Sequence, residues 1–245
     1  MGARAHGIGN TSACLSDVWS AANNIGGLAE LDVPTAAVSY NAIPSFKAFN
    51  RMAAVFGVPA PSGVAGISVF RFGDDLYNEQ LVSLGYANRF GLASLGLKVN
   101  YLQYRAEGMG SHGAFTVSFG GIATITPDLF FGAHIININQ PVINETTGET
   151  LPTTLAAGMA LKLSDRLTIS GEVEKHLAYP PIIKAGIEYK ALKKITFRTG
   201  LNLNPQAAFF GMGFIVKRLE LSYAMQTDRV FSFSHQATVT FPFKE

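Results

Sequence analysis

Polar and apolar side chains alternate along the last stretch of the chain, residues 231–243. Its odd positions are apolar apart from His235, and its even positions up to 240 are Ser232, Ser234, Gln236, Thr238 and Thr240. Because successive side chains of a strand point to opposite faces, this pattern predicts a β-strand with one apolar and one hydroxyl-rich face. The segment is long enough to cross a bilayer at a tilt, which takes about 9–11 residues. A spanning strand needs hydrogen-bonding partners on both edges, so the pattern predicts a closed barrel.

Similar alternation recurs from residue 35 onward, about every fifteen residues. It predicts about fourteen strands, an even number that is typical of bacterial outer-membrane barrels. The predicted strands are 35–43, 49–58, 64–72, 80–87, 92–103, 114–125, 129–139, 153–163, 167–175, 182–190, 195–202, 208–216, 219–226 and 231–243. The fold class is therefore all-β, an antiparallel transmembrane β-barrel.

The predicted connections are alternately short and long, which is the rhythm of outer-membrane barrels with short periplasmic turns and longer outer loops. Residues 126–128, 164–166, 191–194 and 217–218 are short, whereas 104–113 and 140–152 are long, and 204–207 is a short exception. This rhythm predicts that the strands run alternately up and down and that both termini are periplasmic.

The first 33 residues lack this alternation and form a separate N-terminal segment before the barrel of residues 34–245. Residues 12–19 could form a short helix, and 23–28 read as a tight turn. The segment is too apolar to leave in water and too short to cross a membrane. We expect it to lie at or in the periplasmic mouth as a plug, with a loose periplasmic tail as the alternative. The residues expected to form the plug are Ile8, Leu15, Trp19, Asn23 and Leu28.

The composition agrees with a barrel whose apolar residues are spread over alternating positions and not gathered in long runs. The chain is 48% hydrophobic and 15% charged, with 25 glycines, and it has no apolar run of the roughly 18 residues that a membrane helix needs. A net charge of +2, without a basic aromatic patch, argues against a nucleic-acid partner. The single cysteine, Cys14, excludes an internal disulfide. The first residues do not have the pattern of a secretory signal, so for an outer-membrane protein we expect this to be the mature chain.

Charged residues of both signs fall on the predicted lumen face, namely Lys98, Glu172, Glu174, Lys184, Glu188 and Arg198. They could line a polar path, or they could pair across strands and fill a narrow interior, and the need of buried charges for partners favours pairing. We predict a direct ion pair between Lys184 and Glu172 or Glu174, across the hairpin near Tyr179. The remaining lumen positions in this pattern are hydroxylated, Gly or Ala, which argues against an apolar pocket.

The histidines show no metal-ligand spacing, and no cofactor or metal is expected. His235 follows Ser234, but neighbours on a strand point to opposite faces, so they form no catalytic pair. We therefore expect no enzymatic activity. His235 lies in the apolar alternation, where it is either an interfacial neutral imidazole or a contact for a partner docked on the wall.

Acidic residues gather in the predicted outer loops and basic residues in the periplasmic turns. Both rims could simply be solvated. Alternatively, the acidic loops hold divalent cations near lipopolysaccharide and the basic rim meets a periplasmic partner. We expect outer-membrane lipids, lipopolysaccharide and other envelope proteins as partners.

Two segments carry a resemblance to a known family. The first is Gly2-Ala3-Arg4 with Gly7-Ile8-Gly9, followed by Asp17, Trp19, Asn23 and Gly27-Leu28-Ala29; the second is Glu172-Val173-Glu174-Lys175 with Tyr179-Pro180-Pro181, Gly186-Ile187-Glu188-Tyr189 and Ser234-His235-Gln236. They resemble the opening and closing parts of PorV/PorQ-type outer-membrane barrels of Bacteroidota, which are related to the FadL fold. Asn24-Ile25 stands where the family has Pro-Ala, and the chain is shorter than the secretion-system members.

The resemblance implies a FadL-like barrel of about fourteen strands. It also implies a non-enzymatic accessory or scaffold subunit of an envelope protein complex, linked to type IX secretion. A FadL-like transporter of a small hydrophobic compound is the alternative, and it should show an apolar lumen pocket together with a lateral opening or a strand kink. An outer-membrane lipid hydrolase is a third, weaker alternative.

Overall fold

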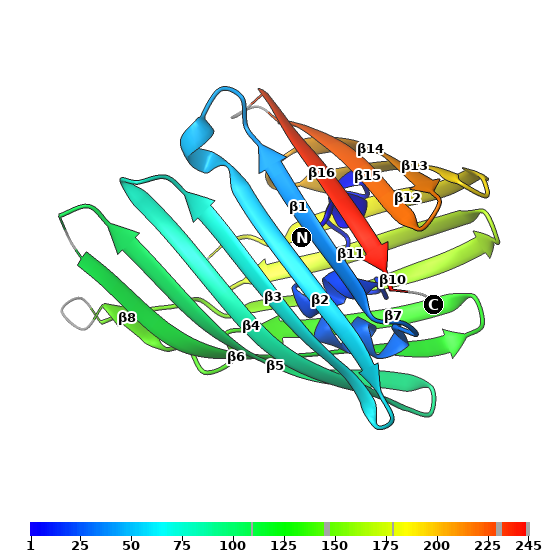
Figure 1. Ribbon diagram of the computed structural model, residues 1–245, viewed down its shortest axis with the longest axis horizontal. Coiled ribbons are helices and arrows are strands. Elements are labelled where there is room, and N and C mark those ends of the chain that lie inside the picture. The colour runs from blue at the N-terminus through cyan, green and yellow to red at the C-terminus, as the bar shows by residue number, and fades with distance from the viewer. Residues whose placement is uncertain (109, 145–147, 178, 229–231, 244–245) are drawn as a thin grey trace.

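The chain folds into one closed antiparallel barrel that surrounds its own N-terminal segment (Figure 1). The computed structural model describes all residues from 1 to 245 except 109, 145–147, 178, 229–231 and 244–245. Fourteen strands form the wall in sequence order, and β1 closes the barrel by pairing with β16 from Thr35↔Pro242 to Ala42↔His235. Within the described residues, none of the helices has the length and apolar character needed to cross a membrane.

The predicted strands all have counterparts in the wall. The wall strands are β1 (Thr35–Ala42), β2 (Arg51–Ala60), β3 (Gly63–Gly73), β4 (Tyr77–Phe90), β5 (Ala93–Ala106), β6 (Gly110–Thr126), β7 (Leu129–Ile136), β10 (Thr154–Ser164), β11 (Leu167–His176), β12 (Ile182–Leu192), β13 (Ile195–Leu203), β14 (Ala207–Val216), β15 (Leu219–Asp228) and β16 (Ser232–Pro242). The predicted all-β barrel is thus confirmed.

Two details of the prediction are wrong, and one connection is more structured than predicted. Residues 104–113 are not a long loop, because β5 and β6 extend through most of them as a hairpin. The long connection predicted at 140–152 is present, and it contains a small hairpin of β8 (Val142–Asn144) and β9 (Glu149–Thr150). Finally, residues 12–19 form no helix of their own: the helical turns are α1 (Ala3–Gly7), η1 (Val18–Ala21), η2 (Ile25–Glu30) and, between β1 and β2, η3 (Lys47–Phe49).

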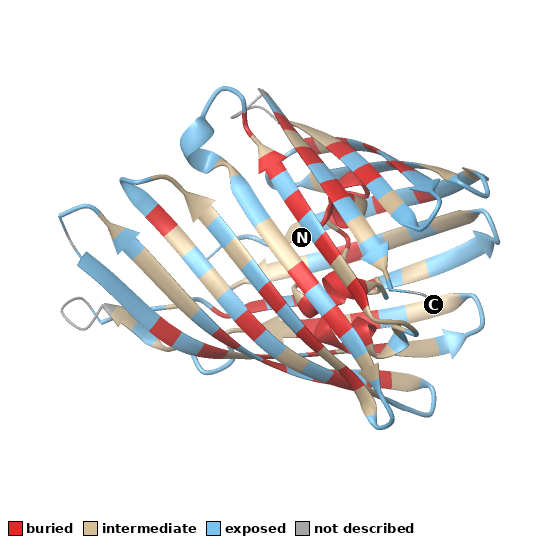
Figure 2. Cartoon of the chain, viewed as in Figure 1, coloured by how far each residue is buried: buried red, intermediate tan, exposed pale blue. Residues whose placement is uncertain are grey.

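Burial alternates along the strands as the sequence pattern requires (Figure 2). In β1, for example, Ala37, Ser39 and Asn41 are buried, whereas Val38 and Tyr40 are exposed on the outer surface. The exposed set is apolar because the lipid-facing side of such a wall must be apolar.

The two ends of the barrel differ in their connections. Strand pairs β2–β3, β4–β5, β6–β7, β10–β11, β12–β13 and β14–β15 are joined by two-residue turns at one end, the short-turn end. The first strand begins and the last strand ends there, since Thr35 pairs with Pro242. The opposite, long-loop end carries η3 and the β8–β9 hairpin.

Candidate functional site

The segment before β1 lies inside the barrel, and we call it the plug. Its helix α1 contacts β13 to β16, η1 contacts β1 to β4, and η2 contacts β3 to β6, so the plug touches most of the wall (Figure 1). Of the five residues expected to form it, Ile8, Trp19 and Leu28 are buried to 3%, 4% and 0% exposure. Asn23 donates from Nδ2 to the Met1 carbonyl at 2.9 Å, and the Leu15 carbonyl accepts from Ser20 Oγ at 2.9 Å.

A first ion cluster joins the plug to β12 and β13. Arg4 of α1 donates to both carboxylate oxygens of Glu188, at 3.0 Å from Nε and 2.8 Å from Nη2. Arg198 donates from Nε to the same carboxylate at 2.7 Å and from Nη1 to Ser222 at 3.2 Å. Arg4 also reaches Asp17 at 3.1 Å within the plug. Glu188 is thereby held between two guanidinium groups, and its charge raises the pKa of Arg4 above the usual value.

A second ion cluster lies on β11 and β12. Lys184 Nζ is 2.8 Å from Glu172 Oε1 and 2.6 Å from Glu174 Oε2, and Glu172 and Lys184 are directly paired across the two strands. His176 Nε2 lies 3.0 Å from the other oxygen of Glu174. The ion pair predicted for Lys184 is therefore present, and it involves both glutamates rather than one.

Two of these lumen charges also hold the plug backbone. The second oxygen of Glu172 accepts from the amides of Ser12 and Ala13, each at 2.7 Å. Lys98 of β5, only 4% exposed, donates to the Ala22 carbonyl at 2.9 Å. Since an irregular segment in a barrel leaves backbone groups unpaired, buried side-chain charges serve here as their partners.

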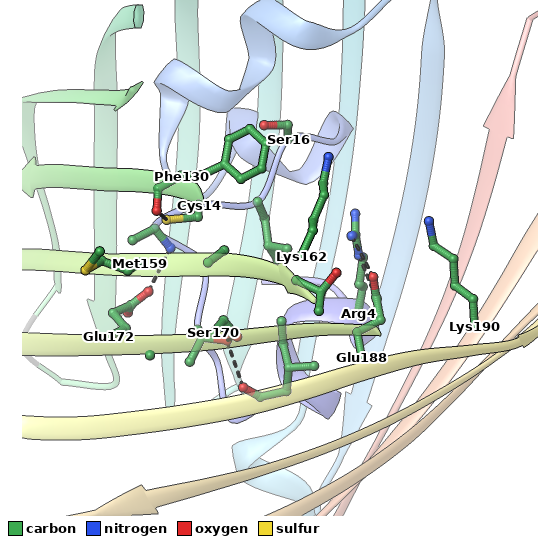
Figure 3. Close-up of a pocket in the computed structure, with 17 residues that line it drawn as sticks. Arg4, Cys14, Ser16, Phe130, Met159, Lys162, Ser170, Glu172, Glu188 and Lys190 are labelled. Carbon is green, nitrogen blue, oxygen red and sulfur yellow. Dashed lines mark hydrogen bonds and ion pairs between the residues drawn. The ribbon is translucent and has the colours of Figure 1, made fainter. Parts of the chain in front are cut away.

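A cavity of about 270 Å³ separates the plug from β7, β10, β11 and β12 (Figure 3). Its plug side is formed by Arg4, Ile8, Thr11 and residues 13–16, and its wall side includes Phe130, Ser170 and Glu172. The Cys14 thiol borders it and donates to the Gly158 carbonyl at 3.4 Å, and burial raises the pKa of this thiol to about 12. A second cavity, of about 510 Å³, opens beside the plug at the short-turn end, along β14 to β16.

The lumen face of the wall carries a ring of glycines that seats the plug, which the strand alternation alone does not predict. A Cβ on Gly66 would lie 2.6 Å from Leu28, and one on Gly85 would lie 2.5 Å from Ile25. On the far side, a Cβ on Gly186 would lie 2.4 Å from the carbonyl oxygen of Ile8. The members of this ring are Gly57, Gly66, Gly85, Gly96, Gly120, Gly132, Gly186, Gly200 and Gly211. The signal that could have revealed them is their inward position in the strand alternation.

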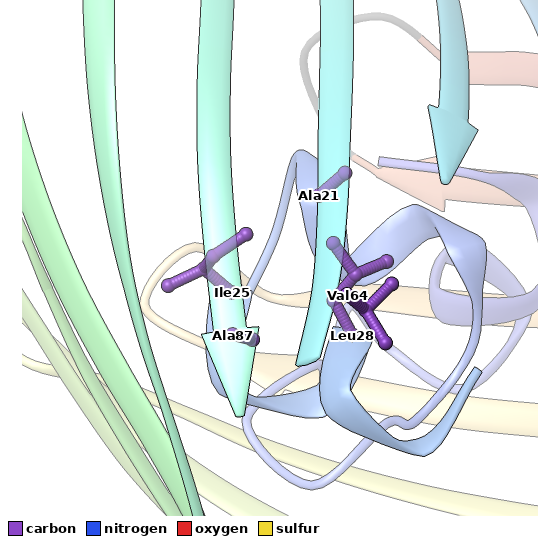
Figure 4. Packing of buried hydrophobic residues seen from close by; sticks show 5 residues of the cluster. All are labelled: Ala21, Ile25, Leu28, Val64 and Ala87. Carbon is purple, nitrogen blue, oxygen red and sulfur yellow. The ribbon is translucent and has the colours of Figure 1, made fainter. Parts of the chain in front are cut away.

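Apolar side chains of η2 fill the space that these glycines leave. Ile25 and Leu28 pack with Ala21 of the plug against Val64 of β3 and Ala87 of β4 (Figure 4). This contact buries five apolar residues, and burial of apolar surface at about 25 cal/mol per Å² stabilises the seated plug.

The lumen is not purely polar on the long-loop side of the plug, which corrects the prediction that it holds only charged, hydroxylated, Gly or Ala side chains. Ala53, Phe70, Leu81, Leu102 and Ala114 pair successively from β2 to β6. They share the inward alternation with the buried row below them, which consists of Val55, Ser68, Ser83, Asn100 and Thr116. We call the first set the apolar row.

His235 points outward on β16, away from the lumen charges. Its Nδ1 lies 2.6 Å from the Tyr223 hydroxyl, and the two rings stack with centroids 6.1 Å apart. Among the described residues, no group of three or more His, Cys, Asp or Glu side chains is placed to hold a metal ion.

Comparisons with known proteins agree on the fold. No family model matches the sequence, and no curated protein matches it. Among solved structures, the toluene transporter TbuX of Ralstonia pickettii superimposes with a TM-score of 0.78 at 12% identity, over 100% of this chain and 98% of that chain. The monoaromatic hydrocarbon channel CymD gives 0.73 at 11% identity, and a FadL homologue of Pseudomonas aeruginosa gives 0.69 at 11% identity, both over 100% of this chain and 98% of theirs.

The chain is accordingly a plugged, fourteen-stranded barrel with the fold of FadL-like outer-membrane proteins. The structures that it resembles are transporters and channels. The specific likeness to PorV/PorQ-type proteins has no counterpart in these comparisons.

Proposed function

We propose that this protein is an outer-membrane channel for a small hydrophobic compound, such as a monoaromatic hydrocarbon. The observation that carries the proposal is the apolar row, which places Phe70, Leu81 and Leu102 side by side on the lumen face above the plug. Half-buried apolar side chains inside a polar lumen have little structural use, but they match a ligand without hydrogen-bonding groups. The fold is shared with a toluene transporter and a monoaromatic hydrocarbon channel, which supports the same class of compound.

Uptake of labelled toluene by cells that lack their own hydrocarbon channel tests this proposal. Expression of the chain should raise the initial rate above that of empty cells, and Leu81→Thr or Leu102→Thr should lower it about tenfold, because a buried apolar contact is worth roughly 1–3 kcal/mol. Leu84→Thr is the matched control, since Leu84 lies on the same strand as Leu81 but faces outward and is 62% exposed. An uptake rate equal to that of empty cells would exclude the channel.

A second candidate is the accessory role in an envelope complex that the PorV/PorQ resemblance implies, including type IX secretion in Bacteroidota. The observation in its favour is the firm attachment of the plug by Arg4, Glu172 and Lys98, which suits a barrel that stays closed. In this case toluene uptake would be absent, and specific envelope proteins would co-purify from native membranes in mild detergent.

The proposed orientation follows outer-membrane barrels in general, with the short-turn end and both termini in the periplasm. The long-loop end, with the apolar row behind it, would then face the medium from which a hydrophobic compound arrives.

A further inference from the structure

Strands β16, β1, β2, β3 and β4 are neighbours in the wall (Figure 1). An apolar groove crosses them on the outer surface of the barrel. Its volume is about 640 Å³. Most of its lining points outward by strand alternation, including Val38, Met52, Val69 and Val82, which are 43–56% exposed. The groove therefore faces the lipid side of the wall and not the lumen.

Small side chains create this groove. Ala54 of β2 pairs with Val38 on one side and Val69 on the other, so a methyl group stands between two branched side chains. Ala237 of β16 pairs with Tyr40 in the same way. The resulting trough is lined by hydrocarbon at the level of Val38, Ala54, Val69 and Val82, and a straight alkyl chain is the shape that fills it with the largest van der Waals contact.

The groove ends in a cation at its long-loop side. Arg71 of β3 lies one step along the outer face from Val69 and is directly paired with Met52 and Gln80, which also line the groove. Its side chain is exposed, and within the described part of the chain its guanidinium makes no ion pair or hydrogen bond. A guanidinium at this position has donors in a fixed fork that matches the oxygens of a phosphate.

Aromatic side chains place Arg71 at the depth where lipid headgroups begin. Tyr40 and Tyr223 are exposed on the outer surface. They lie at the same level as Arg71, because a row of directly paired residues runs from Arg71 through Met52, Tyr40 and Ala237 to Tyr223. Tyrosines on barrel exteriors mark the membrane–water interfaces. An occupant must therefore be apolar over most of its length, anionic at one end, and present in the membrane itself.

We propose that this groove binds one anionic, phosphate-bearing lipid of the surrounding leaflet, with an acyl chain over Ala54 and Ala237 and its phosphate on Arg71. The site is distinct from the lumen and does not depend on the proposed channel activity. Gln80 adds a neutral amide beside the phosphate position.

Native mass spectrometry of the detergent-purified chain with dimyristoyl phosphatidylglycerol tests this site. The wild type should retain one phosphatidylglycerol about fivefold more than Arg71→Gln, the loss expected for one partly exposed ion pair. Ala54→Phe, which fills the trough, should lower retention in the same way. The matched controls are Arg105→Gln, another exposed arginine near the long-loop end, and Ala157→Phe, an exposed alanine on β10 across the barrel. Both should retain the lipid as the wild type does.

Each variant is first checked for the heat-dependent gel shift of a folded barrel, so that loss of lipid is compared only among folded chains. Competition separates the sources of the phosphate: inorganic phosphate at equal concentration should leave the lipid bound. Displacement by inorganic phosphate, equal retention by Arg71→Gln, or equal retention of dimyristoyl phosphatidylcholine would each overturn the proposal, the last because it would mean ordinary contact with surrounding lipid.

Discussion

Lys184 is the most enclosed cation of the second ion cluster, with its side chain 6% exposed between two carboxylates. Lys184→Ala should lower the free energy of unfolding by about 3–5 kcal/mol, because it leaves Glu172 buried without a counter-charge. Urea unfolding in lipid vesicles measures this change. Lys190→Ala on the same strand is the control, since Lys190 is exposed and its removal should cost within about 0.5 kcal/mol.

A double variant tests whether the two groups interact. Lys184→Ala combined with Glu172→Gln should be less destabilised than the sum of the single changes, by about 1–3 kcal/mol. Additive effects would mean that the ion pair contributes nothing to stability.

His6 makes seating of the plug sensitive to acid. It is 7% exposed, packs edge-on against Phe209, and burial lowers its pKa from 6.5 to about 4. Because burial depresses the pKa of His6, the imidazole binds a proton more readily when the plug is released than when it is seated. The contribution of His6 to the stability of the seated plug is therefore fully present above pH 6.5 and is lost as the pH falls toward 4. The free energy that favours the seated plug should fall by about 3 kcal/mol over this range.

The single tryptophan, Trp19, reports this change because it lies buried in the plug. We expect a red shift of its emission between pH 6.5 and pH 4 in the wild type, with a smaller shift in His6→Leu, which cannot be protonated. Identical titration curves for the two proteins would rule out His6 as the source.

At the scale of elements, the strands were predictable and the plug was not. Alternation identifies β1 or β16 because water or lumen lies on one side and lipid on the other, so each position has one favoured polarity. Beyond the part of the wall that faces lipid this contrast ends, which is why the alternation does not predict the long-loop ends of β4, β5 and β6 as strand. The plug shows no periodic pattern of polar and apolar residues, because its backbone is held by the Glu172 carboxylate and the Lys98 ammonium, which lie far away in the sequence.

Within the candidate site, the ion pairs can be predicted from the sequence, but the glycine ring and the apolar row cannot. Inward charges must pair, so Lys184 and its glutamates could be predicted from the register of one hairpin. The glycine ring becomes visible only once nine inward positions are known to meet the same plug. The apolar row was missed for a similar reason, because Phe70, Leu81 and Leu102 form a row only when β3, β4 and β5 are aligned.

The glycine ring predicts a selective effect on the plug. Gly186→Val should displace α1, because the new Cβ would stand 2.4 Å from the Ile8 carbonyl oxygen, while the wall itself should still fold. The substitution should destabilise the seated plug by about 1–3 kcal/mol, as overpacking does at other well-packed sites. Trp19 emission should shift to the red, and the heat-dependent gel shift of the barrel should remain.

Gly171→Val is the matched control on the neighbouring strand. A Cβ at Gly171 meets only the Lys184 carbonyl oxygen, at 4.0 Å, and the position faces outward. Its Trp19 emission should equal that of the wild type, and an equal red shift in both variants would show that the barrel wall, and not the plug, had been disturbed.

At the scale of the whole molecule, the two unequal ends predict how the barrel lies in the membrane. Proteinase K added to intact cells should cut within residues 140–152 of the long-loop end and spare residues 164–166 of the short-turn end. An epitope inserted at either position gives an independent measurement: antibody should reach the first on intact cells and the second only after permeabilisation. The reverse pattern would invert the proposed orientation.

The plug also predicts that the intact barrel conducts poorly. Residues of the plug contact β1 to β6 and β13 to β16, and the cavities beside it, of about 270, 380 and 510 Å³, are lined in part by plug residues. In planar bilayers the whole protein should therefore be silent or nearly so. Removal of residues 1–30 should produce a steady conductance, because a barrel of this size without its plug has room for water between inward side chains that are small along the glycine ring.

The two glycine variants should give different conductances in the same planar-bilayer measurement. Gly171→Val should stay as silent as the intact chain, whereas Gly186→Val should open intermittently, since it disturbs only the seat of Ile8 while Glu172 and Lys98 still hold the rest of the plug. Toluene uptake by the same proteins separates passage from leakage: a channel with an apolar row should take up toluene while its plug still blocks ions. A large steady ion current from the intact chain would make the protein an open porin, and neither the hydrocarbon channel nor the accessory barrel proposed here would survive that result.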